Sequence, residues 1–224
     1  MAAPLAFQLQ VFAHIFASVA EEMGATMHRT AFSPNIKERR DHSCAIFDAD
    51  GHMIAQAAHI PVHLGAMPAS VAAAIALFAD DPAAPGDIVI LNDPYLGGTH
   101  LPDITTVSPI FVDVDEMTVL FGYAATRAHH ADVGGMTPGS MPLSSEIYQE
   151  GLIIPPIKLV RGGEMDEAIM TVMLANVRTP EERRGDFAAQ FSAHRVADRR
   201  IGEMTARYGL DLLREMASEL LAYS

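Results

Sequence analysis

Cysteine is almost absent from this chain. Its 224 residues include one cysteine, Cys44, which excludes an internal disulfide and indicates a reducing compartment. Cys44 lies in the middle of an apolar run, so we expect an inert buried thiol and not a catalytic one.

Basic residues are also scarce. The chain has 15 Lys and Arg against 28 Asp and Glu, which gives a formal net charge of -13. A surface of this sign repels nucleic acid and anionic lipid, so we expect neither as a partner.

Long hydrophobic runs and targeting signals are missing as well. No stretch reaches the ~18 uninterrupted apolar residues of a membrane span. The N-terminal run 2–20 is interrupted by polar residues, lacks a basic leader and continues into Glu21 and Glu22. We therefore expect a cytoplasmic protein with no membrane partner.

Two common catalytic loops are absent too. The pair Gly97-Gly98 lacks the further glycines, the lysine and the following helix of a phosphate-binding loop. No Gly-x-Ser-x-Gly elbow presents a serine nucleophile. The ten histidines are a generous supply for chemistry near neutral pH or for metals.

The distribution of apolar residues predicts a mixture of strands and helices. Half of the residues are hydrophobic and 19% are charged, as in a folded globular protein. Alternation and β-branched content predict strands at 43–47, 53–56, 87–92, 104–114, 117–126 and, as a short edge strand, within 153–160. Three- and four-residue periodicity predicts helices at 7–30, 66–78, from 164, from 180 to about 208, and at 210–221.

These elements predict an α+β fold with a mixed or antiparallel sheet core, flanking helices and a helical C-terminal section. We expect residues 1–162 to form the sheet region, and residues 163–224 to form a helical region that does not fold independently. The apolar face of the last helix is predicted to dock on material outside this chain, and the loop 136–142 to form a lid or rim.

The stretch from Asn92 to Gly135 is predicted to organise the chemistry. Its two strand-like runs, 104–114 and 117–126, are separated by Asp115 and Glu116, which suits a hairpin turn. A hairpin brings the start of its first strand beside the end of its second.

This hairpin would place His100 and Asp103 next to His129, His130 and Asp132. Imidazoles and a carboxylate that converge at the end of a rigid sheet predict a divalent-metal site, with Mn, Fe, Co or Zn as the candidate ions. A polar network at a strand end is the equally weighted alternative. The lack of nearby cysteines argues against a structural zinc site.

The charged segment 35–41 permits two interpretations. It is either a solvated loop with local ion pairs, or a site in which Lys37, Arg39 and Arg40 hold a carboxylate or phosphate.

His59 and His63 form a second histidine pair. Pro61 between them is expected to prevent a helix, so both imidazoles would lie on one side of an extended chain. They are candidates for substrate binding, with metal ligation and buried hydrogen-bonded histidines as the alternatives.

Six motifs, in order, resemble the hydantoinase B / 5-oxoprolinase family. They are Asn-Ile-Lys-Glu-Arg-Arg-Asp (35–41), His-Ile-Pro-Val-His-Leu-Gly (59–65), Asn-Asp-Pro-Tyr with Gly-Gly-Thr-His-Leu-Pro-Asp (92–103), His-His-Ala-Asp-Val-Gly-Gly (129–135), Pro-Gly-Ser (138–140) and Ala-Asn-Val-Arg-Thr-Pro-Glu-Glu-Arg (175–183). The family includes N-methylhydantoinase beta subunits and, more distantly, acetone carboxylase alpha subunits. Its members are much longer, so this chain resembles their N-terminal portion.

The resemblance implies a subunit of an enzyme that opens a cyclic amide, hydantoin or 5-oxoproline, at the expense of ATP. A partner hydantoinase A-like ATPase subunit would phosphorylate the carbonyl oxygen, and the present chain would act on the activated intermediate at a divalent metal (Mn, Zn or Fe). Lys37, Arg39 and Arg40 would then steady the phosphorylated intermediate. The expected assembly is a hetero-oligomer.

The acetone carboxylase branch of the family implies the ligand set. A His-x-x-Asp pair and a later histidine hold manganese there, and these positions match His100, Asp103 and His129, with His130 as the close competitor. Catalytic roles are implied for His130 and Asp132, the latter by orienting a ligand. Two alternatives stay open: an ATP-dependent ketone carboxylase subunit, or a non-catalytic assembly module.

Overall fold

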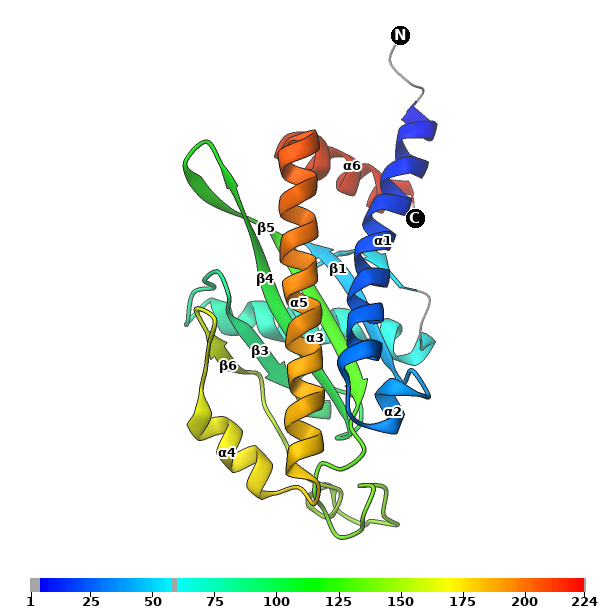
Figure 1. The fold of residues 1–224 in the computed structure, drawn as a ribbon, viewed down its shortest axis with the longest axis vertical. Helices are drawn as coiled ribbons and strands as arrows, with labels where there is room; N and C mark the ends of the chain where they lie inside the picture. The colour runs from blue at the N-terminus through cyan, green and yellow to red at the C-terminus, as the bar shows by residue number, and fades with distance from the viewer. Residues whose placement is uncertain (1–4, 58–59, 224) are drawn as a thin grey trace.

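A computed structural model of the chain describes residues 5–57 and 60–223, and its strands form one seven-stranded antiparallel sheet with helices on both faces (Figure 1). The strand order is β2-β1-β5-β4-β3-β6-β7. This arrangement confirms the predicted α+β fold with an antiparallel core.

The helices are α1 (Leu5–Thr30), α2 (Pro34–Lys37), α3 (Pro61–Phe78), α4 (Glu167–Ala175), α5 (Pro180–Tyr208) and α6 (Leu210–Tyr223), with short 3₁₀ turns η1 (Pro94–Leu96) and η2 (Ile147–Gln149). The strands are β1 (His42–Asp48), β2 (Met53–Gln56), β3 (Ile88–Leu91), β4 (Asp103–Val114), β5 (Met117–His129), β6 (Ile157–Arg161) and β7 (Glu164–Met165).

The predicted hairpin is the central pair of strands, β4 and β5. Its turn residues Asp115 and Glu116 both have positive φ, 48° and 65°, as a two-residue hairpin turn of matching twist requires. The pairing runs from Val114 opposite Met117 to Asp103 opposite His129. At the end of the hairpin opposite its turn, Asp103 and His129 therefore lie side by side on adjacent strands.

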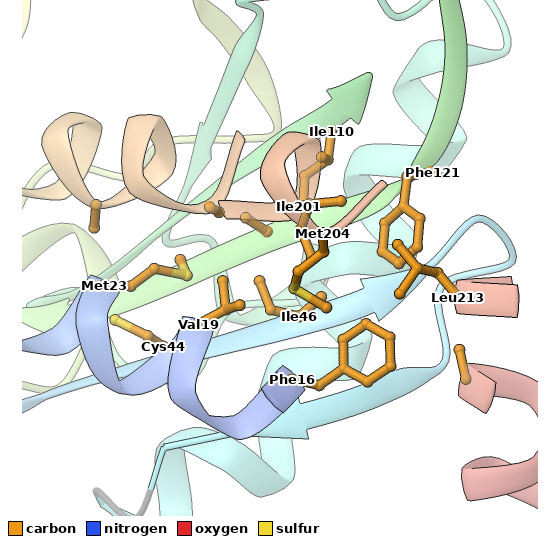
Figure 2. Close-up of a cluster of buried hydrophobic side chains, with 14 of the residues drawn as sticks. Phe16, Val19, Met23, Cys44, Ile46, Ile110, Phe121, Ile201, Met204 and Leu213 are labelled. Carbon is orange, nitrogen blue, oxygen red and sulfur yellow. The ribbon is translucent and has the colours of Figure 1, made fainter. Parts of the chain in front are cut away.

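One face of the sheet is covered by α1, α5 and α6. Figure 2 shows this core, where Phe16 and Met23 of α1 meet Ile46 of β1, Met204 of α5 and Leu213 of α6. The buried residues of α6 belong to this cluster and pack near α1 and β2. The prediction that α6 docks on material outside the chain is therefore wrong.

The opposite face is covered by α3. Its buried residues Leu64, Met67, Val71 and Ala74 pack against the central strands. By length and composition alone this helix could also cross a membrane; in this fold its buried residues pack against the sheet.

The predicted extended chain through Pro61 is wrong, because α3 begins at that residue. Proline suits the first helical position, where the missing N–H has no intrahelical partner to lose. Its fixed φ is also already helical. His63 therefore lies in the first helical turn.

Two further local predictions need correction. The charged segment 35–41 contains the short helix α2, which starts at Pro34. β6 is not an edge strand, since it pairs with both β3 and the two-residue β7. Its two prolines, Pro155 and Pro156, precede the strand and leave its ladder intact.

Candidate metal centre

The candidate site lies at the end of the β4–β5 hairpin opposite its turn. Asp103 is the first residue of β4 and His129 the last of β5, and the two are partners in the register. His100 comes from the turn that leads into β4. The strand pairing therefore fixes two of these side chains, and the preceding turn supplies the third.

The turn that carries His100 depends on close backbone packing. The side chain of Asn92 donates to the carbonyl of Leu101 at 2.8 Å. A Cβ on Gly98 would lie 2.2 Å from the carbonyl oxygen of Asn92, so only glycine fits there. The glycine at position 98 thus permits the close backbone approach that positions this turn.

His100, Asp103 and His129 converge on one another, as the hairpin argument predicted. His100 Nδ1 lies 3.2 Å from Asp103 Oδ2, and His129 Nδ1 lies 3.2 Å from Asp103 Oδ1. His100 Nε2 and His129 Nδ1 are also 3.2 Å apart. The Asp103 side chain is 3% exposed and that of His100 43%, so the cluster opens to solvent on the His100 side.

His63 joins the same carboxylate from the first turn of α3. Its Nε2 is 3.3 Å from Asp103 Oδ2 and 3.6 Å from Asp41 Oδ1, and its Nδ1 is 3.4 Å from Ser43 Oγ. The structure thus places this predicted substrate-binding residue within the metal-ligand cluster. His59, predicted to act beside it, lies outside the described residues.

The electrostatics of the cluster keep Asp103 ionised. Burial alone raises the pKa of this carboxyl, but hydrogen bonds from His100, His129 and His63 outweigh it and hold the pKa well below its usual range. The hydrogen bond to Asp103 in turn raises the pKa of His100, against the effect of burial.

Arg127 is a neighbour that the sequence analysis missed. It precedes His129 by two residues on β5, so both side chains project from the same face. Arg127 Nε donates to Thr105 Oγ1 at 2.8 Å and Nη2 to Ser70 Oγ at 2.7 Å. Within the described residues its buried Nη1 has no hydrogen-bond partner. The two-residue spacing between Arg127 and His129 could have indicated that their side chains lie on the same face of the sheet.

The donor set fits a divalent metal ion. Bonds of about 2.0–2.2 Å to nitrogen and oxygen place neighbouring ligand atoms roughly 3.0–3.6 Å apart. One candidate ligand atom from each of His100, Asp103 and His129 lies within 4.8 Å of the other two. The contacts of His129 Nδ1 with Asp103 Oδ1 and with His100 Nε2, both 3.2 Å, lie in the expected range. Two imidazoles and a carboxylate suit Mn, Fe, Co or Zn.

His130 lies away from the cluster. Its Nε2 is 3.0 Å from Gln190 Oε1 of α5, and its ring packs at 4.7 Å from that of Phe187. Burial lowers its pKa to about 4, which keeps the imidazole neutral near neutral pH. Successive residues of extended chain face opposite sides of a sheet, so His129 and His130 cannot share an ion. The position does not support the catalytic role predicted for His130.

Asp132 stabilises the loop after β5. It accepts a hydrogen bond from the Gly134 N–H at 2.9 Å and pairs with Arg178 Nη1 at 2.9 Å. Burial raises the pKa of Asp132, but these contacts outweigh it and lower the pKa. The contacts of this carboxylate thus hold the loop together. The geometry does not support the prediction that Asp132 orients a metal ligand.

Lys37, Arg39 and Arg40 are exposed side chains. Arg40 lines a surface cavity of about 550 Å³ together with His28 and His42, apart from the Asp103 cluster. The segment nevertheless touches the site through Asp41, whose carbonyl accepts from the His129 N–H at 3.0 Å.

Comparison with known proteins adds sequence relatives. The profile of the Hydantoinase B/oxoprolinase family matches residues 6–224. The 5-oxoprolinase 1 of Arabidopsis thaliana is 41% identical over 216 residues, which are 91% of this chain and 17% of that protein. A putative B-type subunit of a D-/L-hydantoinase from Pseudomonas sp. is 33% identical over 221 residues, 96% of this chain and 37% of that protein.

Solved structures agree with the fold. The ATP-dependent caprolactamase from Pseudomonas jessenii superposes with a TM-score of 0.84 at 34% identity, covering 96% of this chain and 36% of the other. A nucleotide-free acetone carboxylase gives a TM-score of 0.86 at 21% identity, with 95% and 28% covered, which supports the fold alone. The chain thus spans well under half the length of these relatives.

Proposed function

Because the chain belongs to the hydantoinase B/oxoprolinase family, we propose that it is the metal-binding part of an ATP-dependent enzyme that opens a cyclic amide, such as a hydantoin or 5-oxoproline. The names of the relatives, which are a 5-oxoprolinase, a B-type hydantoinase subunit and a caprolactamase, support this substrate class. The observation that carries the proposal is the buried carboxylate of Asp103, contacted by His63, His100 and His129.

His100, Asp103 and His129 would hold the divalent ion, Mn, Zn or Fe. When bound, it supplies Lewis-acid polarisation of a substrate oxygen. His63 and the Thr99 hydroxyl, which donates to Asp103 Oδ2 at 3.1 Å, fix the orientation of the carboxylate.

Positive charge at the site would serve an activated, phosphorylated intermediate. Arg127 brings a buried guanidinium to the same sheet face as His129. Lys37, Arg39 and Arg40 are exposed on the segment whose Asp41 is bonded to the His129 backbone. They retain the proposed role of steadying the phosphate group.

The ATP would be used by a partner, a hydantoinase A-like ATPase subunit. A relative whose name gives it as one subunit of a hydantoinase supports such a hetero-oligomer. This chain spans only part of the length of its relatives. In this proposal the complete enzyme therefore contains further protein. A cytoplasmic location is part of the same proposal.

Metal content tests the ligand set. We expect the purified chain to retain about one divalent ion, and His100→Ala to lower its affinity by tenfold or more. His52→Ala is the matched control, because His52 belongs to a separate group near the surface, Asp48, Asp50 and His52, that could also hold a metal. Elemental analysis after dialysis measures both, with circular dichroism to confirm folding. Loss of metal in His52→Ala and retention in His100→Ala would reject the assignment.

Reconstitution with an A-type subunit tests the reaction. We expect ATP-dependent release of the ring-opened acid from hydantoin, 5-oxoproline or caprolactam, and no incorporation of labelled bicarbonate into a ketone. Incorporation without ring opening would place the chain with the carboxylases. Stable assembly without metal or turnover would identify a non-catalytic module.

A further inference from the structure

A second cavity lies on the sheet face opposite the metal centre. It has a volume of about 330 Å³, within the range of small-molecule sites, and opens between α5 and the strands β3, β4 and β6. Ile88, Val160, Met165 and Phe191 supply apolar walls. The cavity therefore favours a ligand with an apolar portion.

Asp198 of α5 is the polar group in this cavity that lacks a partner. Its Oδ1 is buried and accepts no hydrogen bond from the part of the chain that the structure describes. Burial raises the pKa of this carboxyl to about 6. At neutral pH the cavity thus contains a half-buried carboxylate, and none of the described residues replaces the lost hydration of its Oδ1.

Both ring nitrogens of the neighbouring His194 already form hydrogen bonds. His194 Nε2 lies 2.7 Å from Thr106 Oγ1, and Nδ1 lies 2.8 Å from Ser108 Oγ. Burial lowers the pKa of His194 to about 3, so the ring is neutral. Neither ring nitrogen is left to ligate a metal or to neutralise Asp198.

Among the described residues, no other charged group of the lining forms an ion pair with Asp198. Asp87 pairs with Lys158 at 2.8 Å and accepts from the Gly162 N–H at 2.8 Å. Arg195 is exposed, and its Nη2 donates to Ser192 Oγ at 2.9 Å. The cavity therefore calls for a hydrogen-bond donor that carries positive charge.

We propose that this cavity binds a primary ammonium group on a short apolar chain, with the ammonium on Asp198 and the chain against Ile88, Val160 and Phe191. A free alkylamine and a lysine side chain share this chemistry. The two sources are therefore distinguished by experiment.

Calorimetric titration of the purified chain with n-butylamine at neutral pH tests the site. We expect saturable binding that weakens at least tenfold in Asp198→Asn, whose side chain keeps its shape but loses its charge. Asp211→Asn is the matched control, since it removes the same charge from an exposed position on α6 and leaves binding unchanged. n-Butanol, which lacks the positive charge, should give no saturable heat.

Nα-acetyl-lysine N-methylamide separates the two sources. Binding of both this compound and butylamine supports a lysine side chain as the occupant, and binding of butylamine alone supports a free amine. Equal binding of butylamine by wild type and Asp198→Asn, equal binding of butanol, or no saturable heat with either amine would overturn the proposal. The result is independent of metal content, so it separates this site from the proposed function.

Discussion

Asp103 and Asp198 are two acids of the same sheet-and-helix framework with opposite electrostatic environments. Three imidazoles hold the pKa of Asp103 well below its usual range despite its burial. Asp198 accepts no such hydrogen bond from the residues that the structure describes, and burial raises its pKa to about 6. Neighbouring donors, and not burial as such, decide whether the pKa of a buried acid lies below or above its ordinary value.

Cys44 gives a prediction at this scale. Its thiol is buried 3.6 Å from the sulfur of Met27, and burial raises its pKa. The thiolate is the reactive form, so we expect Ellman's reagent at about pH 8 to leave the native chain unmodified. The same reagent in guanidinium chloride should label one thiol per chain. Rapid labelling of a chain with native circular dichroism would contradict the predicted burial.

At the scale of elements, close contact between β1 and β5 depends on one glycine. Gly122 lies opposite Asp48 of β1, next to the register shift between Ile110 and Phe111 of β4. A Cβ at this position would lie 2.1 Å from the carbonyl oxygen of Phe47. A side chain here would push apart the strands at the centre of the sheet.

We therefore expect Gly122→Ala to lower the free energy of unfolding by about 1–3 kcal/mol, the usual cost of overpacking. Gly202→Ala is the control, because Gly202 lies within α5 and nothing is within 4 Å of an added Cβ. Higher helix propensity should make that variant up to about 1 kcal/mol more stable. Urea denaturation measures both changes. Equal stability of Gly122→Ala and wild type would show that β1 can move without cost.

At the scale of the whole molecule, α5 is joined to the sheet through a row of buried polar residues. Its residues Arg183, Asp186, Gln190 and His194 are buried and polar, and they follow the three- to four-residue spacing of one helical face. Gln190 donates to Thr126 and the carbonyl of Ile104, while His194 contacts β4. The helix is thus held to the sheet by hydrogen bonds as well as by apolar contact.

The neutral state of His194 makes global stability depend on pH. Its pKa is about 3 in the folded chain and 6.5 when exposed, so below pH 6.5 the unfolded chain takes up a proton that the folded chain does not. Stability from this group is complete above pH 6.5 and falls by about 1.4 kcal/mol per unit between about pH 4 and pH 6.

We expect His194→Asn to reduce the slope of unfolding free energy against pH by about that amount. Urea denaturation at several pH values measures the slope in both proteins. Other titrating groups, including Asp198 with its opposite sign, are common to both and cancel. Parallel pH profiles for wild type and variant would show that His194 is protonated in the folded chain.

The sequence by itself determined the hairpin and the meeting of His100, Asp103 and His129. This was possible because a turn flanked by two strand-forming runs brings the start of the first strand beside the end of the second. The sequence did not reveal the register shift between Ile110 and Phe111, which makes His129, and not Ala128, the partner of Asp103. The order of helices and strands was equally local, since periodicity and turn residues signal each element without reference to the others.

Only the tertiary structure decided which other residues join that cluster. His63 contacts Asp103 because α3 begins at Pro61 and packs on the same face of the sheet. His130 lies on the opposite face, where it contacts Gln190 of α5. The sequence likewise did not predict the buried polar face of α5, because charged and polar residues on a helix ordinarily indicate a solvent-exposed surface. These outcomes depend on packing between segments far apart in the chain, which no local pattern encodes.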